Sequence, residues 1–389
     1  MAHDTPDDAP DEALAEVLAG RRLLRLGSVR GLDLPVVAGA GVYCATSGST
    51  GGTPSVVALG PATIAHAVAA TDERLGGPGA WLLSLPDDHV AGLMVRARAL
   101  TAGAPLVRGH AGAFTAAGFA RDVALLHDAT PPGLRRYGSL VPTQLHRVLE
   151  DAGAATAAAS LDAVLLGGAA APEPLLARAR AARVPVVTTY GMTETAGGCV
   201  YDGVPLRGTS VAIDDDGRIR LRGDQVALGY VTARGLEPFD GEVLTNDRGR
   251  WEQTAGGRRL RVLGRRDDVI VSGGVNVDPH AVEAAALAVE GVAEAAAVGV
   301  PDPEWGQLVC LALRVDPGTA AGVAEDVRVA IRDRLGAASV PKRVLAGEDS
   351  LPLRGPGKID RRALVARFAQ TDASGTPRAG HHPATGGED

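Results

Sequence analysis

Lysine is nearly missing from this chain of 389 residues: Lys342 and Lys358 are its only two, and arginine supplies the rest of the 39 basic side chains. This preference indicates that arginine is used wherever any cation is adequate, so a retained lysine can mark a place where arginine is unsuitable. An ammonium is a compact point charge on a flexible stem, whereas a guanidinium is a broad planar fork. Lys358 is therefore a candidate for a tight site that meets developing negative charge. Chance placement on a surface loop is the alternative.

Cysteines, aromatic residues and long apolar runs are also scarce, and each scarcity excludes a class of protein. The three cysteines include no CxxC pair, which argues against a disulfide framework or zinc site and predicts reduced thiols in a cytoplasmic protein. With only 3% aromatic residues, the core must consist of Ala, Val and Leu. No apolar run reaches the roughly 18 residues of a membrane span, and the acidic start Met1–Ala13 does not resemble a signal peptide. A net charge of −7 argues against nucleic acid as a partner.

Apolar strands alternate with helical patterns in the first half of the chain, which predicts βαβ units around parallel sheets. The expected strands are 81–85, 104–107, 138–141, 163–166 and 184–189. The expected helices are 90–101, 114–127 and 172–182, and a further helix is expected to begin at Pro142. Turn-rich sequence over 208–247 predicts β-hairpins. The predicted fold class is α/β, with a large N-terminal domain (13–266) in which helices flank parallel sheets and β-hairpins are added. A small mobile α+β domain (267–369) follows, and residues 1–12 and 370–389 are predicted to be disordered.

A loop rich in glycine and hydroxyl residues, Thr46–Pro54, follows the apolar run Leu34–Ala45. Glycines let successive N–H groups face one side and hydroxyls add donors, so such a loop can cradle phosphate oxygens. A flexible linker is the alternative. The loop lacks the Gly-Lys-Ser/Thr ending of a P-loop, and it lacks the glycine of a nucleophile elbow two positions before Ser49. The predicted phosphate-binding residues are Thr46, Ser47, Gly48, Ser49, Thr50 and Gly51.

Five blocks in register over residues 34–369 resemble the acyl-adenylate-forming (ANL) superfamily of acyl-CoA synthetases and related ligases. They are Thr46–Pro54, Thr189–Thr195, Leu244–Asp247, Gly264–Gly274 and Gly357–Asp360. Two further stretches, Ser139–Leu145 and Leu161–Ala170, are similar to the o-succinylbenzoate–CoA ligase family of menaquinone biosynthesis. The resemblance implies that a small-molecule acid is activated by ATP as an acyl-adenylate and is then transferred to CoA. ATP, Mg²⁺ and coenzyme A are the implied ligands, and the oligomeric state, a homodimer included, stays open.

The resemblance also assigns roles to individual residues. Lys358 would reach the carboxylate and α-phosphate, Thr193 would contact the α-phosphate, and His89 would lie near the acyl carboxylate. Glu194 would bind magnesium, and Asp267 would be the pivot about which the small domain turns between the two half-reactions. The remaining nucleotide-binding residues would be Gly168, Ala169, Ala170, Tyr190, Gly191, Met192, Asp247 and Arg265.

Each assignment has a plainer alternative. Glu194 can be a solvated carboxylate at a helix start, Asp247 a turn residue, and Arg265 a surface cation in an arginine-rich chain. An isolated histidine such as His89 is often only structural.

Two positions depart from the family pattern. Ser55 stands where the phosphate loop usually carries lysine, and Asn246 stands where glycine is usual, although asparagine also tolerates left-handed backbone. Two rival functions therefore stay open: a CoA ligase for another aryl or acyl acid, and a non-catalytic nucleotide-binding homologue.

Overall fold

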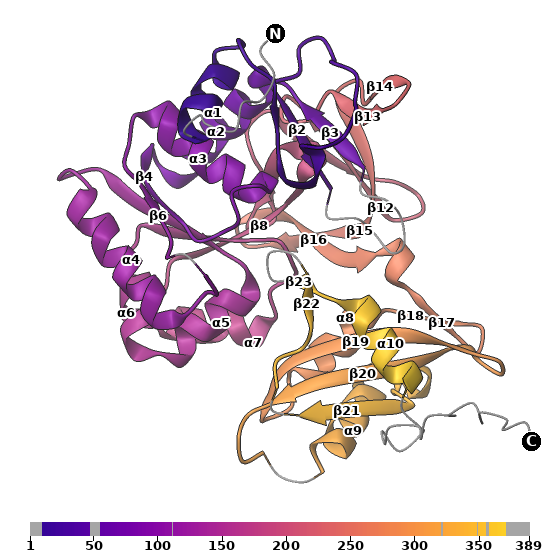
Figure 1. Cartoon of the computed structure of the whole chain (residues 1–389). Helices are drawn as coiled ribbons and strands as arrows, with labels where there is room; N and C mark the ends of the chain where they lie inside the picture. Colours follow the sequence, from indigo (N-terminus) through magenta and orange to yellow (C-terminus); the bar gives the residue numbers. More distant parts are fainter. Residues whose placement is uncertain are drawn as a thin grey trace, which may run out of the picture. The chain divides into compact units, whose positions relative to one another are not determined.

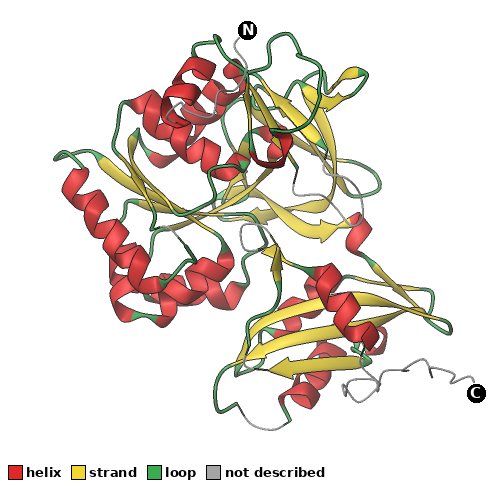
Figure 2. Ribbon diagram, in the orientation of Figure 1, coloured by secondary structure: helices red, strands yellow, loops and turns green. Residues whose placement is uncertain are grey.

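The computed structural model describes residues 10–46, 55–110, 112–319, 322–347, 349–354 and 358–370. The chain divides into two compact units: the first consists of the described residues up to Leu263 together with Lys358, and the second consists of the described residues 264–354 and 359–370. Figure 1 follows the chain by colour, and Figure 2 separates helices from strands. Within the described ranges, no helix is both long enough and apolar enough to cross a membrane.

The first unit is built around a seven-stranded sheet, five strands of which are parallel. Its order is β10 (Val204–Pro205), β9 (Gly197–Tyr201), β8 (Val186–Met192), β7 (Ala163–Leu166), β6 (Arg135–Leu140), β4 (Gly79–Leu83) and β5 (Leu106–Arg108). Strands β8, β7, β6, β4 and β5 run parallel, whereas β9 pairs with β8 in the antiparallel sense. The predicted α/β class is thereby confirmed, and the strands expected from the sequence agree with β4–β8 to within a few residues.

Helices cover both faces of this sheet because its strand side chains alternate between them. Ala80 and Leu82 pack with the helices of one face, whereas Trp81 and Leu83 pack with those of the other. The first face carries α4 (Ala116–Ala129), α5 (Pro142–Glu150), α6 (Ala152–Ala159) and α7 (Glu173–Ala181), and the second carries α2 (Pro61–Leu75) and α3 (Val90–Ala102), as Figures 1 and 2 show. Helices α2 and α6 were not predicted from the sequence.

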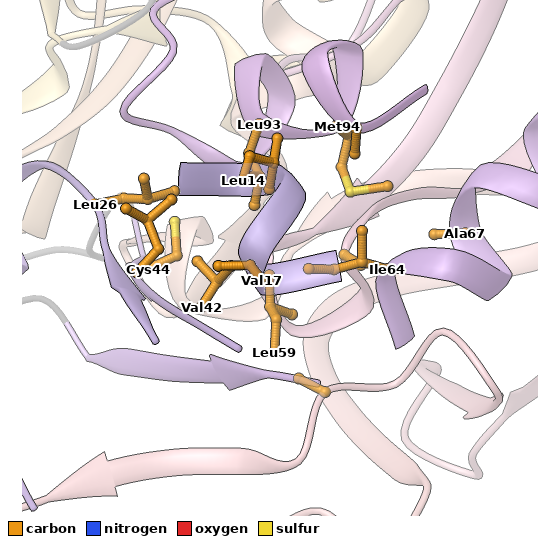
Figure 3. Close-up of a cluster of buried hydrophobic side chains, with 14 of the residues drawn as sticks. Leu14, Val17, Leu26, Val42, Cys44, Leu59, Ile64, Ala67, Leu93 and Met94 are labelled. Carbon is orange, nitrogen blue, oxygen red and sulfur yellow. The ribbon is translucent and has the colours of Figure 1, made fainter. Parts of the chain in front are cut away.

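A second sheet of the same unit has the order β1 (Leu24–Arg25), β2 (Val42–Ala45), β3 (Val56–Leu59), β13 (Gly229–Thr232) and β14 (Gly235–Pro238). Helix α1 (Pro10–Leu18) closes its core, and Leu14 and Val17 are fully buried there (Figure 3). The helix begins at Pro10, so it includes three residues that were expected to be disordered. One of them, Asp11, accepts hydrogen bonds from the buried Arg96 at 2.9 Å and from Arg108 at 2.7 Å.

A third sheet consists of β11 (Thr209–Ile213), β12 (Arg218–Gly223), β15 (Glu242–Thr254) and β16 (Gly257–Arg265). Strand β12 pairs antiparallel with both β11 and β15, which confirms the hairpins expected over 208–247. The buried residues Ile219, Leu221 and Val243 pack against Cys199 and Val200 of β9. The third sheet is therefore anchored to the end of the main sheet.

The second unit is an α+β unit whose central strands form one sheet. Its strands are β17 (Ile270–Ser272), β18 (Val275–Val277), β19 (Val292–Asp302), β20 (Gly306–Val315) and β21 (Arg343–Gly347). Side chains of β19 again alternate between the two faces of the sheet and contribute to two cores. Ala295 and Ala297 pack with α8 (Pro279–Ala286) and α9 (Val323–Leu335), whereas Ala296 and Val298 pack with α10 (Arg361–Gln370). Helix α10 ends at Gln370, the first residue of the tail that was predicted to be disordered.

Candidate functional site

The predicted phosphate loop joins the two strands of a β-hairpin. Strands β2 and β3 are antiparallel with Ala45 opposite Val56, and the Thr46 N–H donates to the Ser55 carbonyl at 2.8 Å. Thr46 is therefore described at the base of the loop, whereas Ser47, Gly48, Ser49, Thr50 and Gly51 lie outside the described residues. The exposed Ser55, which replaces the family lysine, stands at the same base.

The end of β8 carries the next group of predicted residues: Tyr190, Gly191 and Met192. Gly191 approaches the following strand so closely that a Cβ there would lie 2.0 Å from the Gly197 carbonyl oxygen. The Thr195 hydroxyl accepts from the Met192 N–H at 3.0 Å and donates to the Gly197 carbonyl at 2.8 Å. This tight turn presents Thr193 and Glu194 directly after the strand.

Glu194 is held beside β13, which pairs with β3, the strand that follows the predicted phosphate loop. Its Oε1 accepts from the Tyr230 hydroxyl at 2.8 Å, and its carbonyl accepts from the Ala227 N–H at 2.8 Å. Tyr230 lies in β13 opposite Val57 of β3. Burial raises the pKa of the neighbouring Cys44 to about 12, and the charges of Asp88 and Glu194 add to that rise. Glu194 therefore lies close to the base of the phosphate loop.

Asp247 and Tyr190, which are far apart in the sequence, form a hydrogen bond. The Tyr190 hydroxyl donates to Asp247 Oδ2 at 2.8 Å. Burial, strengthened by the Asp247 charge, raises the pKa of Tyr190 well above its usual range, so the phenol remains a neutral donor. The Asp247 N–H donates to the Thr245 hydroxyl at 3.1 Å, which fixes the backbone at Asp247 in β15. This contact unites two predicted nucleotide-binding residues.

Asn246 lies within β15, in extended backbone. Among the described residues, four that are not glycine have positive φ, namely Arg183, Ala196, Asp202 and Asp240, and Asn246 is not one of them. An extended residue at this position needs no glycine, so the tolerance of asparagine for left-handed backbone is not used here.

His89 begins α3 as its N-cap residue, and its Nδ1 lies 2.7 Å from Asp88 Oδ1. The adjacent Asp87 accepts from Arg108 at 3.4 Å, and Arg108 also binds Asp11. The loop that carries His89 is thus tied to helix α1. Sequence patterns gave no signal for this link, because a short N-terminal helix and a lone arginine carry no motif.

The predicted nucleotide-binding residues Gly168, Ala169 and Ala170 form an exposed loop after β7, which is the neighbour of β8 in the sheet. Gly168 has φ +82°, a conformation that glycine adopts without strain. The preceding Gly167 lies against Thr189, whose hydroxyl would be 2.4 Å from a Cβ at that position. Parallel strands gather such loops at their carboxyl ends, where ligands bind in sheets of this kind.

The other predicted residues, Arg265, Asp267 and Lys358, lie in segments that come later in the chain than the residues described above. Arg265 donates twice to Asp267, with both nitrogen–oxygen distances at 2.8 Å. This pairing lowers the pKa of Asp267. Lys358 lies in the short strand β23 (Lys358–Ile359), the partner of β22 (Leu353–Arg354).

The described residues suit a magnesium ion that is shared with phosphates better than one held by the protein alone. They include no cluster of three or more His, Cys, Asp or Glu side chains able to enclose a metal. Oε2 of Glu194 has no hydrogen-bond partner among them. Mg²⁺ is commonly bound through one or two carboxylates and substrate phosphates, which matches this donor set.

Comparison with known proteins gives matches over most of the chain. The AMP-binding enzyme family matches residues 42–231, and the AMP-binding enzyme C-terminal domain matches residues 281–358. A Mycobacterium tuberculosis protein named probable 2-succinylbenzoate–CoA ligase is 43% identical over 328 residues, which cover 83% of each chain. A 2-succinylbenzoate–CoA ligase of Geobacillus sp. is 29% identical and is matched over 60% of its own length and 73% of this chain.

Two solved structures extend the comparison. A variant of E. coli MenE with bound OSB-AMS is 28% identical with a TM-score of 0.66, over 84% of this chain and 68% of that one. A Bacillus subtilis o-succinylbenzoate CoA synthetase shares the fold with a TM-score of 0.68 at 23% identity, over 91% of this chain and 80% of that one.

Proposed function

Because the chain belongs to the family of AMP-binding enzymes, we propose that it is an ATP-dependent o-succinylbenzoate–CoA ligase of menaquinone biosynthesis. The acid and ATP give an acyl-adenylate and pyrophosphate, and the CoA thiol then displaces AMP to form o-succinylbenzoyl-CoA. The observation that carries this proposal is the 43% identity, over 83% of both chains, to a protein named for that reaction.

The geometry of the first unit supports the adenylation half-reaction. The hairpin loop that starts at Thr46 would hold the triphosphate with its N–H and hydroxyl groups. Glu194 would hold Mg²⁺, which neutralises phosphate charge when bound. Asp247, oriented by Tyr190, would accept hydrogen bonds from the ribose hydroxyls. The loop Gly168–Ala170 would flank adenine, and Thr193 and His89 would lie near the α-phosphate and the acyl carboxylate.

Lys358 and Asp267 would serve the change between the half-reactions. The Lys358 ammonium would stabilise charge where the carboxylate oxygen attacks the α-phosphate. A turn about Asp267 would then remove the lysine and admit CoA, so a large domain over 13–266 and a small mobile domain over 267–369 are part of the proposal. Two half-reactions with different needs would thereby share one site.

The decisive experiment measures both products with the full chain. We expect pyrophosphate release from ATP, Mg²⁺ and o-succinylbenzoate, and a thioester of the matching mass when CoA is added. Thioesters from simple benzoates or fatty acids, with o-succinylbenzoate untouched, would contradict the substrate and retain the class. Nucleotide binding without pyrophosphate release for any acid would favour the non-catalytic homologue. A cytoplasmic location and a homodimer are part of the proposal, and fractionation and light scattering test them.

A further inference from the structure

Helix α8 of the second unit carries two polar side chains, His280 and Glu283, on the same face of its first turn. Asp278 caps this helix by accepting from the His280 N–H at 2.9 Å. His280 Nδ1 lies 3.1 Å from Glu283 Oε2, so the two side chains form a pair. Residues three apart on a helix are neighbours, which explains this contact.

Glu283 connects α8 to the start of α10. Its Oε1 accepts from Arg361 Nη1 at 2.6 Å and from the Ala297 N–H of β19 at 2.8 Å. Arg361 Nη1 also donates to the Ala297 carbonyl at 2.5 Å. The Glu283 side chain is only 12% exposed. One buried carboxylate therefore fixes three elements, α8, β19 and α10, which are labelled in Figure 1.

His280 connects the same helix to the segment that contains Asp267. Its Nε2 lies 3.9 Å from Asp268 Oδ2 in the turn after β16. Gly264, with φ +121°, passes so close to the ring that a Cβ would lie 2.4 Å from His280 Cδ2. A larger residue at Gly264 would therefore displace the histidine.

Arg361 is joined to Lys358 by a short stretch that is itself held in place. Ile359 packs against the core formed with Leu364 and Phe368 of α10. The Asp360 N–H donates to the Pro352 carbonyl at 2.7 Å, and the Asp360 carboxylate caps α10. Three residues span at most about 10 Å, so Lys358 cannot lie far from the position at which Glu283 holds Arg361.

These contacts form a continuous chain from the segment 264–268 to Arg361, which lies three positions after Lys358. We propose that His280, Glu283 and Arg361 are positioning residues. They make residues 264–268, which contain the predicted pivot Asp267, turn as one body with the segment that carries Lys358. The inference rests on the proposed function, because it assigns the network to the placement of Lys358 during adenylation. None of the three residues is proposed to contact the substrates.

The charges of the network agree with this role. Burial alone would raise the pKa of Glu283, but Arg361 and His280 outweigh it and hold the pKa below its usual range. Burial would likewise lower the pKa of His280, yet the Glu283 carboxylate beside it raises it. Asp268 and Asp278 are the other acidic groups around the ring. Glu283 and Arg361 form a largely buried ion pair, in which loss of one partner leaves a charge unpaired.

The test uses Glu283→Gln and His280→Gln in the full chain, with pyrophosphate release without CoA as the readout. We expect adenylation to fall about tenfold in kcat with little change in the KM for ATP, because misplacing a catalytic group mainly affects the transition state. Thioester formation from preformed acyl-adenylate should stay within about twofold of the parent, since Lys358 has left the site by then. Arg314→Gln is the matched control, because it breaks another largely buried ion pair of the same unit, to Glu294 at 2.9 Å.

A second comparison distinguishes positioning from simple stability. If the network acts through Lys358, Glu283→Gln should cause almost no further loss in a Lys358→Ala background, because coupled residues are not additive. The inference would be overturned if Glu283→Gln lowered adenylation equally in the parent and in the Lys358→Ala background. It would also be overturned if Arg314→Gln lowered adenylation as much as Glu283→Gln. Should Glu283→Gln fail to fold, His280→Gln carries the same comparison. If the parent protein adenylates a different acid, only the proposed identity of the substrate is overturned, and the test is then made with that acid. A parent that adenylates no acid would overturn the inference as well.

Discussion

Different means hold the candidate-site carboxylates of the first unit and the buried carboxylate of the second unit in place. In the first unit, the carboxylates of Glu194 and Asp247 each accept from a neutral tyrosine hydroxyl at 2.8 Å. In the second unit, Glu283 forms an ion pair with the Arg361 guanidinium at 2.6 Å and contacts the His280 ring at 3.1 Å. A neutral donor orients a carboxylate without cancelling its charge, whereas an ion pair neutralises that charge. Carboxylates of the first kind are suited to bind cations or hydroxyls of a ligand, and those of the second kind are suited to fix structure.

The largest expected effect comes from Lys358, which would connect the two kinds of site. We predict that Lys358→Ala and Lys358→Arg each lower adenylate formation by roughly a hundredfold or more, the scale for removing one preorganised charge-stabilising group. The arginine variant should fail because a planar fork does not fit where a compact ammonium does. Pyrophosphate release without CoA measures this loss.

The other lysine of the chain is the control. Lys342 Nζ lies 4.6 Å from the centre of the Trp305 ring, an arrangement that arginine also adopts. Lys342→Arg should therefore leave adenylation unchanged. Normal adenylation by Lys358→Arg would make Lys358 an ordinary surface cation and would remove the argument from the scarcity of lysine.

The next largest effect tests the assignment of Glu194 to magnesium binding. We predict that Glu194→Gln lowers magnesium-dependent adenylation by at least about tenfold, because a neutral amide replaces a metal-binding carboxylate poorly. Tyr230→Phe removes only the orienting hydroxyl, so it should cost less and keep the same dependence on magnesium. A Glu194→Gln enzyme with an unchanged magnesium titration would exclude Glu194 from the metal site.

Sequence patterns predicted the parallel sheet well and the N-terminal region poorly. Strands β4 to β8 are apolar runs flanked by turn residues, and such runs carry a local signal. Helix α1 is short and follows an acidic stretch, so its burial depends on Leu14 and Val17 meeting distant strands. Tertiary contacts of that kind are not visible in a local pattern.

The candidate site divides in the same way. Glycine-rich and strand-end motifs singled out Thr46, Tyr190, Glu194 and Asp247 as candidates, because those motifs are contiguous in the sequence. The partner of Glu194 was missed, since Tyr230 lies 36 residues away. In the second unit, the pair of Glu283 with Arg361, which lies 78 residues away, was missed as well. The binding roles of these four candidates stay predictions, as do those of His89, Arg265, Asp267, Lys358 and the phosphate loop.

A smaller effect is expected where an orienting hydroxyl is removed from the ribose side of the site. Tyr190→Phe deletes the donor to Asp247 and leaves the ring, so the carboxylate keeps its charge but loses one constraint. We predict a rise of a few fold in the KM for ATP with kcat nearly unchanged, as befits uniform binding. Asp247→Asn should raise the KM further. Equal effects of the two variants would show that the hydroxyl, and not the carboxylate charge, dominates ATP binding.

The smallest expected effect concerns pH and the charged network of the second unit. The pKa of His280 is raised above its ordinary value of 6.5, because Glu283 outweighs the burial that would lower it. A raised pKa in the folded state means that the folded protein binds more protons, so this contribution is complete below about pH 6.5. It is lost as pH rises through the folded pKa.

We therefore predict that amide exchange in α8 and β19 accelerates more in the parent than in His280→Gln as pH rises from 6 to 8.5. The comparison uses the ratio of parent to variant at each pH, because intrinsic exchange rates then cancel. In acid the sign reverses: the lowered pKa of Glu283 gives stability that is lost as pH falls through that pKa, in both proteins. A constant ratio across the alkaline range would show that folding does not raise the pKa of His280, and the protonated ring would then contribute no stability to the network.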